Sequence, residues 1–174
     1  MAVRVRVLYR FTPSASRPFI LYGRLGPWTV DGIDAVFPPD AALRLIRTGS
    51  PAWQLTVTAP DGTLLAARSG VSDLRVRPAS ELSRLQLWSK PSYYDTYRGS
   101  LRILASSTVT VINEVPLDQY LLGVVPAEMP PTWPAEALRA QAIAARSYAV
   151  NRIRPTVGTW DVTDDTTSQV YRGV

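Results

Sequence analysis

VINEVPLDQYLLGVVPAEMPPTWPAEALRAQAIAARSYAV, residues 111–150, decides the class of fold, because strand-like alternation gives way within it to helical spacing. Pro116 suits the start of a first helix and Gly123 a position near its end, and the apolar residues between them recur every three or four positions. A second helix is expected at residues 134–153, where alanine fills 7 of 20 positions and favours a helix by its propensity. The segment therefore predicts a strand followed by two helices.

The second expected helix is apolar nearly all round, which is typical of a central helix with neighbours packed closely against its alanines. Arg139 and Arg146 share one stripe of this helix, and arginines buried there would need carboxylate partners. The candidate partners are Glu128, Glu136, Asp164 and Asp165. The alternative is that both arginines simply face water.

The first 115 residues are rich in strand signals separated by short turns. Strands are expected at residues 3–11, 19–23, 74–78 and 84–88, in a hairpin at 53–67 around Pro60-Asp61-Gly62, and in a pair at 99–115 around Ser106-Ser107. A short helix is expected at residues 37–49. The predicted fold class is α+β, with a β-rich N-terminal region at residues 1–94 and a second domain at residues 95–174 that contains the alanine-rich helix.

The composition narrows the possible chemistry. The chain has neither cysteine nor histidine, which excludes disulfides, thiol nucleophiles, Cys/His zinc sites and a Ser-His-Asp triad. Its net charge of +5 suits a polyanionic partner, or else reflects a solvated basic surface. The arginines are scattered and never occur three in a row, so nucleic acid is not expected as a partner.

The second half of the chain resembles the SpoIID/LytB domain family. The resemblance rests on YRGSL (97–101), on the 111–150 segment quoted above, and on SQVYRG (168–173). Within the long segment, the matching motifs are NEVPLDQYLLGVVPAEMP and WPAEALRAQAIAARSYA. The resemblance covers about residues 95–174, whereas residues 1–94 match only as a β-rich lead-in.

The resemblance implies a peptidoglycan lytic transglycosylase that cleaves glycan strands, preferably those lacking stem peptides, to 1,6-anhydro-muramic acid ends. It implies that Glu128, the acid of the EMP motif, is the catalytic residue. The residues that it implies for substrate binding are Arg139, Gln141, Arg146, Tyr148, Gln169 and Tyr171. The alternative that it leaves open is a non-catalytic glycan-binding module that enhances a cell-wall amidase. Either function implies an extracytoplasmic location in the cell envelope with glycan strands as partners, and the enhancer function adds a cell-wall amidase as a partner.

The chain departs from the family pattern in two places. Sporulation members bind zinc through Cys and His after the helix, and residues 151–168 contain neither, so no metal and no other cofactor is expected. The family domain also continues beyond the Q-Y-G segment, so we expect this chain to be a C-terminally truncated form of it. Residues 3–11 predict a strand and not a secretion signal, so either the protein is cytoplasmic or its leader or anchor lies outside this chain. The envelope location that the resemblance implies favours the second alternative.

A single carboxyl group suffices for the implied reaction. Ordinary glycosidases use two carboxylates, but here the C6 hydroxyl of muramic acid attacks its own C1, and one acid can act as both proton donor and acceptor. Val124, Val125 and the prolines around Glu128 could supply apolar surroundings that favour its proton-donating form. The alternative is that Glu128 is a structural acid at a helix N-terminus.

Two other features allow a structural and a functional interpretation. Trp133 is either a core aromatic residue or a sugar-stacking platform. Thr163, Asp164 and Asp165 bind a cation, cap a turn or lie in a solvated loop.

Overall fold

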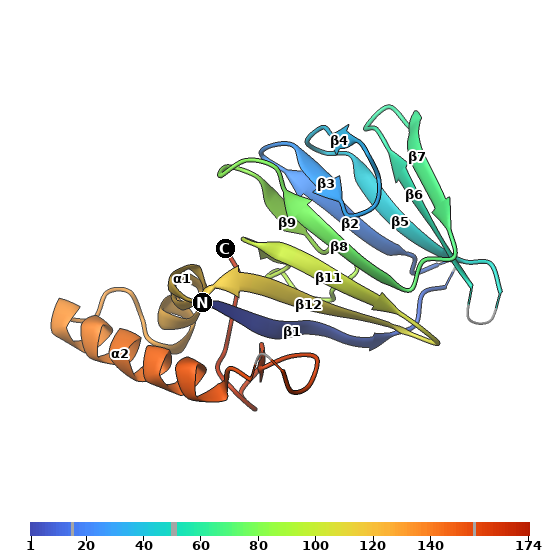
Figure 1. Cartoon of the computed structure of the whole chain (residues 1–174). Helices are drawn as coiled ribbons and strands as arrows, with labels where there is room; N and C mark the ends of the chain where they lie inside the picture. The colour runs from blue at the N-terminus through green and yellow to red at the C-terminus, as the bar shows by residue number, and fades with distance from the viewer. Residues whose placement is uncertain (15, 50–51, 155) are drawn as a thin grey trace.

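The computed structural model describes residues 1–14, 16–49, 52–154 and 156–174 (Figure 1). The strands of these residues, in chain order, are β1 (Ala2–Phe11), β2 (Phe19–Arg24), β3 (Trp28–Val30), β4 (Val36–Phe37), β5 (Ala42–Arg47), β6 (Trp53–Thr58), β7 (Leu64–Ser69), β8 (Asp73–Pro78), β9 (Arg84–Gln86), β10 (Thr96–Tyr97), β11 (Ser100–Ala105), β12 (Val109–Pro116) and β13 (Val162–Thr163). The helices are α1 (Leu117–Glu128) and α2 (Ala135–Arg152). The α+β class is confirmed.

The strands form two sheets, with the order β13-β1-β12-β11-β8-β3-β4 in one and β10-β9-β2-β5-β6-β7 in the other. Neighbouring strands are antiparallel, apart from the parallel pair β1–β13. Alternation decides which residues point inward: Val3, Val5 and Val7 of β1 are buried, while Arg4 and Arg6 are half-buried on its other face. Apolar residues of both sheets and of both helices enter one hydrophobic core.

The end of β12 holds α1 in place. Ala2 pairs with Pro116 in the β1–β12 ladder, and the backbone N–H of Leu117 donates to the carbonyl of Met1 at 3.2 Å. The first turn of α1 is therefore joined to the first residues of the chain. In Figure 1 both helices lie at this end of the sheets, and the β1–β2 connection lies at the other end.

Gly123 lies inside the first helix, because α1 continues past the position predicted to be near its end and reaches Glu128. A Cβ atom at this position would lie 2.6 Å from the carbonyl oxygen of Gly173 and 2.6 Å from the Tyr171 ring. Gly123 therefore allows the C-terminal tail to pack directly against the helix, which is a different reason for a glycine than the termination of a helix.

The alanine-rich helix occupies Ala135–Arg152, close to the predicted range, but its surroundings differ from those predicted. Only Ala145 and Ala149 are buried among its residues, and Ile143 is 67 % exposed. The expectation that neighbours pack closely around its alanines is therefore wrong for the described part of the chain. Alanine has a high helix propensity whether it is buried or exposed, so the pattern predicted the helix correctly but not which of its residues are buried.

The short helix expected at residues 37–49 is also wrong, because the strand β5 occupies the middle of this range. Leu43 and Leu45 are buried, and β5 is paired on one side with β2 and on the other with β6. Pairing on both edges satisfies the backbone of β5 and outweighs a local preference for a helix. The hairpin at β6–β7 and the β11–β12 pair occur where they were predicted.

The boundary predicted at residue 94 does not coincide with a break in either sheet. β1 pairs with β12 across it, and β9 pairs with β10. The division into two domains stays a prediction about independent folding. No helix among the described residues is long and apolar enough to cross a membrane.

Candidate functional site

Glu128 is the last residue of α1, and its side chain is exposed. Its Oε1 atom accepts a hydrogen bond from the backbone N–H of Val170 at 2.6 Å. The alternative that the acid is stabilised at a helix N-terminus is therefore wrong, since a helix C-terminus disfavours negative charge. The N–H of Val170 supplies a compensating dipole and holds one carboxylate oxygen in place.

The two flanking residues of Val170 anchor the tail in the core. Gln169 is buried, and its Oε1 atom accepts a hydrogen bond from the hydroxyl of Tyr120 at 3.2 Å. Tyr171 is buried as well, and its hydroxyl donates to Oδ1 of Asn113 at 2.8 Å. Because both side chains are held inside the protein, they fix the backbone of Val170 between them.

Asn113 is the polar centre of this arrangement. It is fully buried in β12, and its Nδ2 atom donates to the carbonyls of Arg98 at 2.8 Å and Ser100 at 3.1 Å. All three bonds together satisfy the buried amide, which avoids the cost of an unpaired polar group. Asn113 thereby fixes the Tyr171 hydroxyl relative to the sheet.

The tyrosines beneath the site form a close aromatic group. The Tyr120 and Tyr171 rings lie 5.0 Å apart, and the Tyr97 and Tyr171 rings 6.1 Å apart. Burial raises the pKa of Tyr120, and the proximity of Tyr148 and Glu128 raises it further. Burial raises the pKa of Tyr171 in the same way. Both phenols therefore stay protonated at neutral pH and act as hydrogen-bond donors.

The other predicted substrate-binding residues lie on α2. Arg139 pairs with Glu136 at 2.6 Å, and Glu136 was among the predicted partners. Arg146 pairs with Asp118, which was not among them. Both arginines are exposed, so these ion pairs contribute little to stability. Arg139 and Tyr148 are nine residues apart, which is about 14 Å along a helix.

Gln141 and Tyr148 are half-buried on α2, and the Arg152 guanidinium lies 5.1 Å from the Tyr148 ring centroid. The described contacts thus bring Glu128, Gln169 and Tyr171 close together. They leave Arg139 and Arg146 on the open surface of α2.

Sequence reasoning missed Asn113 and Tyr120 as parts of the site. Tyr120 matched the apolar face of the first helix, so nothing local distinguished it from a core residue. Asn113 carried a usable signal, because an amide in the middle of the apolar VINEV strand must find partners when it is buried.

In the turn after α2, hydrogen bonds and an ion pair hold Thr163, Asp164 and Asp165. Asp165 accepts hydrogen bonds from the Thr163 hydroxyl at 2.9 Å and the Thr167 N–H at 2.9 Å, which is a capped turn. Asp164 instead pairs with Lys90 at 2.5 Å, and this Lys90 ammonium also donates to Tyr97 at 2.7 Å. Among the described residues, no group of three or more His, Cys, Asp or Glu side chains could hold a metal ion.

Trp133 lies in the connection between the helices and is 51 % exposed, so the interpretation as a core aromatic residue is wrong. Trp133 follows Glu128 by only five residues, and its role as a sugar-stacking platform stays a prediction.

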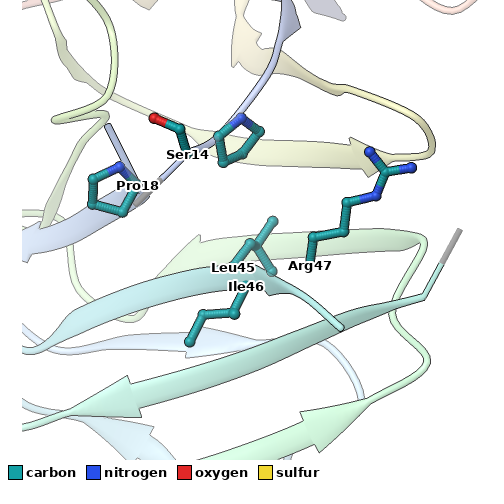
Figure 2. Close-up of a pocket in the computed structure, with 6 residues that line it drawn as sticks. Ser14, Pro18, Leu45, Ile46 and Arg47 are labelled. Carbon is teal, nitrogen blue, oxygen red and sulfur yellow. The ribbon is translucent and has the colours of Figure 1, made fainter. Parts of the chain in front are cut away.

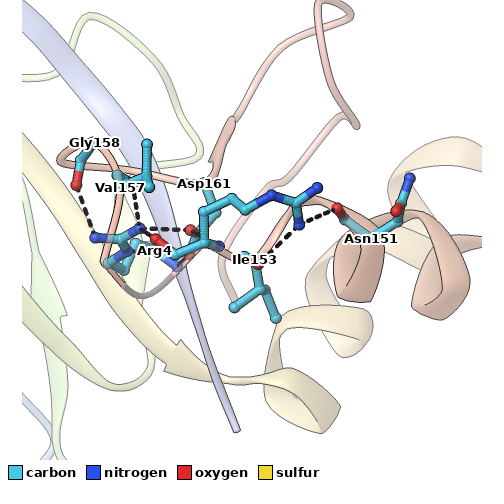
Figure 3. Close-up of polar contacts among 7 residues, drawn as sticks. Arg4, Asn151, Ile153, Val157, Gly158 and Asp161 are labelled. Atoms are coloured by element: carbon cyan, nitrogen blue, oxygen red, sulfur yellow. Dashed lines mark hydrogen bonds and ion pairs between the residues drawn. The ribbon is translucent and has the colours of Figure 1, made fainter.

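Arg4 ties the loop after α2 to the first strand (Figure 3). Its guanidinium donates to Asp161 at 2.7 Å and to the carbonyls of Arg154 at 2.6 Å and Gly158 at 3.0 Å. Burial alone would raise the pKa of Asp161, but the hydrogen bonds from the Arg4 side chain and from the backbone N–H groups of Arg154 and Arg4 outweigh it and lower the pKa. This charged contact sets the direction in which the tail returns toward α1.

A pocket of about 430 Å³ shares no lining residue with this site (Figure 2). Pro13, Ser14 and Pro18 line it together with Leu45, Ile46 and Arg47. It lies beyond the end of β1 that is opposite α1, and no carboxylate is among these lining residues. It is therefore not a candidate for acid–base chemistry.

Comparison with known proteins finds relatives for the C-terminal part of the chain. Residues 105–174 match the SpoIID family, described as stage II sporulation protein. An uncharacterized protein of Brachyspira hyodysenteriae is 45 % identical over 80 residues, which is 44 % of this chain and 22 % of that protein. The stage II sporulation protein D of Bacillus subtilis is 51 % identical over 39 residues, which is 22 % of this chain and 11 % of that protein.

The amidase enhancer of Bacillus subtilis is 47 % identical over 53 residues, which is 30 % of this chain and 7 % of that protein. The matches thus span less than a quarter of each of these three relatives. No solved structure matches the chain. The matched segment contains Glu128, α2 and the tail that carries Gln169 and Tyr171. Over residues 105–174, the chain is similar to the SpoIID family of stage II sporulation proteins.

Proposed function

We propose that this protein acts in the cell envelope on peptidoglycan as a lytic transglycosylase, with Glu128 as acid and then as base. The observation that carries the proposal is the placement of Glu128: its carboxylate is exposed to a large substrate, while one oxygen is held by the N–H of Val170. Its position in a segment of the SpoIID family supports a role at the cell wall. The net charge of +5 suits an anionic wall polymer.

In the proposed reaction, the Glu128 carboxyl first gives its proton to the glycosidic oxygen. The bond between this oxygen and C1 of muramic acid breaks, and the leaving sugar departs with a free hydroxyl group. The C6 hydroxyl of the same muramic acid then bonds to C1 and returns its proton to Glu128. The 1,6-anhydro ring forms without water, and the acid ends in the protonation state in which it began.

The surrounding residues fall into two groups in this proposal. Gln169 and Tyr171 are positioning residues, because their buried hydrogen bonds place Val170 against the carboxylate. Arg139, Gln141, Arg146 and Tyr148 contact the glycan along α2, where exposed guanidinium groups can reach acetamido and lactyl oxygens. Residues 95–174 supply the chemistry, and β1 supports them through its ladder with β12.

Glu128→Gln in the full chain tests the proposal, with Glu136→Gln as a matched control. Glu136 is an exposed acid on the neighbouring helix and pairs only across the surface with Arg139. We expect Glu128→Gln to lower the release of anhydro-muramic products from denuded glycan strands by about 10²–10⁴-fold, and the control to keep it. Product release that persists in Glu128→Gln would exclude Glu128 as the acid.

A second candidate is a non-catalytic module that stimulates an amidase, and the similarity to the Bacillus subtilis amidase enhancer favours it. The same preparations distinguish the two functions. If the unaltered protein releases no anhydro ends but accelerates an added cell-wall amidase, the enhancer function is the correct one.

A further inference from the structure

A second pocket, of about 730 Å³, lies in the connection between β9 and β10. Among the residues that line it are Gln86, Trp88, Lys90, Ser92, Tyr93 and Asp95. The pocket thus combines aromatic rings with a small number of polar groups, which is the usual make-up of a site for a small ligand or one unit of a polymer.

The aromatic rings of this pocket are turned toward solvent. Tyr93 is fully exposed and Trp88 is 57 % exposed, although large aromatic side chains are normally at least partly covered. The Trp88 ring packs against Tyr22 in a T-shaped contact, with the ring centroids 6.1 Å apart at 85°. A braced indole with an open surface is suited to stacking against a flat apolar ligand face.

The polar groups of the pocket are fixed in position. The Gln86 amide accepts a hydrogen bond from Arg24 at 2.7 Å and donates one to Asp95 at 2.9 Å. The second Asp95 oxygen accepts from the Thr96 hydroxyl at 3.0 Å. Because these groups are already oriented, a ligand can use their remaining hydrogen-bonding capacity without ordering the side chains first.

The pocket and Glu128 lie along the same C-terminal tail. Lys90 in the pocket pairs with Asp164, and the Arg172 guanidinium lies 4.5 Å from the centroid of the Tyr94 ring. Val170, which donates to Glu128, is only two residues before Arg172, a separation of at most about 7 Å along an extended backbone. A ligand several units long could therefore follow the tail from the pocket to the acid.

We infer that the Gln86–Asp95 pocket is a glycan subsite, which binds a sugar unit of the strand that Glu128 cleaves. A pyranose ring presents an apolar C–H face to Trp88 and Tyr93, while its hydroxyl and acetamido groups hydrogen-bond to Gln86, Ser92 and Asp95. This inference rests on the proposed function for the identity of the polymer. A proline-rich peptide also docks on aromatic grooves, but the oriented amide–carboxylate pair in the lining of this pocket favours a ligand that is polar around its whole edge.

The experiment measures binding of purified denuded glycan strands and of the β-1,4-linked N-acetylglucosamine hexamer by calorimetry. The variant is Trp88→Ala with Tyr93→Ala in the full chain, and the matched control is Tyr9→Ala, an exposed aromatic residue on β1. We expect at least a tenfold weaker binding of the strands in the double variant, and unchanged binding in the control. Tyr93→Ala alone should weaken binding in the same direction without any effect on folding, because its ring is fully exposed.

The outcomes separate the subsite from the chemistry. Unchanged glycan binding in the double variant would overturn the subsite, whether or not Glu128→Gln abolishes product release. Binding of a proline-rich peptide in place of glycan would overturn it as well. If glycan binding depends on Trp88 and Tyr93 but the unaltered protein releases no anhydro ends, the subsite stands and the transglycosylase proposal fails.

Discussion

The carboxylate of Glu128 accepts a hydrogen bond from the backbone N–H of Val170 at 2.6 Å, across 42 residues of sequence. This bond connects the end of α1 to a tail whose neighbouring side chains, Gln169 and Tyr171, are buried in the core. The orientation of the candidate acid therefore depends on how the tail packs, and the following predictions test this dependence.

Removing the N–H of Val170 should impair the site without removing any of its side-chain chemistry. Val170→Pro eliminates the donor, so the Glu128 carboxylate loses its fixed orientation, and we expect roughly 10- to 100-fold slower release of anhydro products. Val170→Ala retains the N–H and serves as the control. Equal rates for the proline and alanine variants would show that the hydrogen bond does not orient the acid.

Adding a methyl group at Gly123 should loosen the tail. The new Cβ would lie 2.6 Å from the Gly173 carbonyl oxygen and from the buried Tyr171 ring, neither of which can move freely. Overpacking of this kind costs about 3 kcal/mol, and the better helix propensity of alanine recovers about 1 kcal/mol. We therefore expect Gly123→Ala to lower the free energy of unfolding in urea by about 2 kcal/mol.

The control for this substitution is Gly49→Ala, where the nearest atom to the added Cβ is Ala52 Cβ at 3.5 Å, an ordinary contact. Its free energy of unfolding should stay within about 0.5 kcal/mol of the unaltered protein. A stable Gly123→Ala variant would mean that the tail packs less closely on α1 than the structure shows.

The contact between Arg4 and Asp161 should make stability depend on pH in the acid range. The pKa of Asp161 is lowered in the folded protein, so its contribution is fully present above the ordinary carboxyl pKa and is lost as pH falls through the folded value. Asp161→Asn should therefore cost about 2 kcal/mol of unfolding free energy at pH 7, and the cost should shrink below about pH 4. Urea unfolding of both proteins at pH 7, 5 and 3 measures this difference, and a cost that is constant with pH would contradict it.

Much of the fold followed from local patterns. Alternation in β1 and the Pro60-Asp61-Gly62 turn predicted a strand and a hairpin that the structure contains, because both signals act within a few residues. The prediction failed at residues 37–49, where pairing of β5 with two distant strands overrides the local preference. It also failed for the surroundings of α2, because alanines report propensity and not burial.

The candidate site also contains some residues that the sequence predicted and others that it did not. The motif resemblance identified Glu128, Gln169 and Tyr171, but it carried no information on their spatial relationship. Tyr120 became recognisable only through its hydrogen bond to Gln169, whereas Asn113 carried a signal in the sequence but its partner Tyr171 did not follow from it. The aromatic pocket at residues 86–95 matched no motif at all.

Periodicity, propensity and motif are properties of neighbouring residues, so the α+β class, the extent of α2 and the candidate acid could be predicted from the sequence. The contacts of Val170 with Glu128, and of Arg4 with Asp161, 157 residues away, follow only from the three-dimensional packing. Contacts of this length arise from the order in which strands pair and from the close approach that Gly123 permits. The physical reason is that many distant segments compete for each partner, and packing of the whole core selects among them.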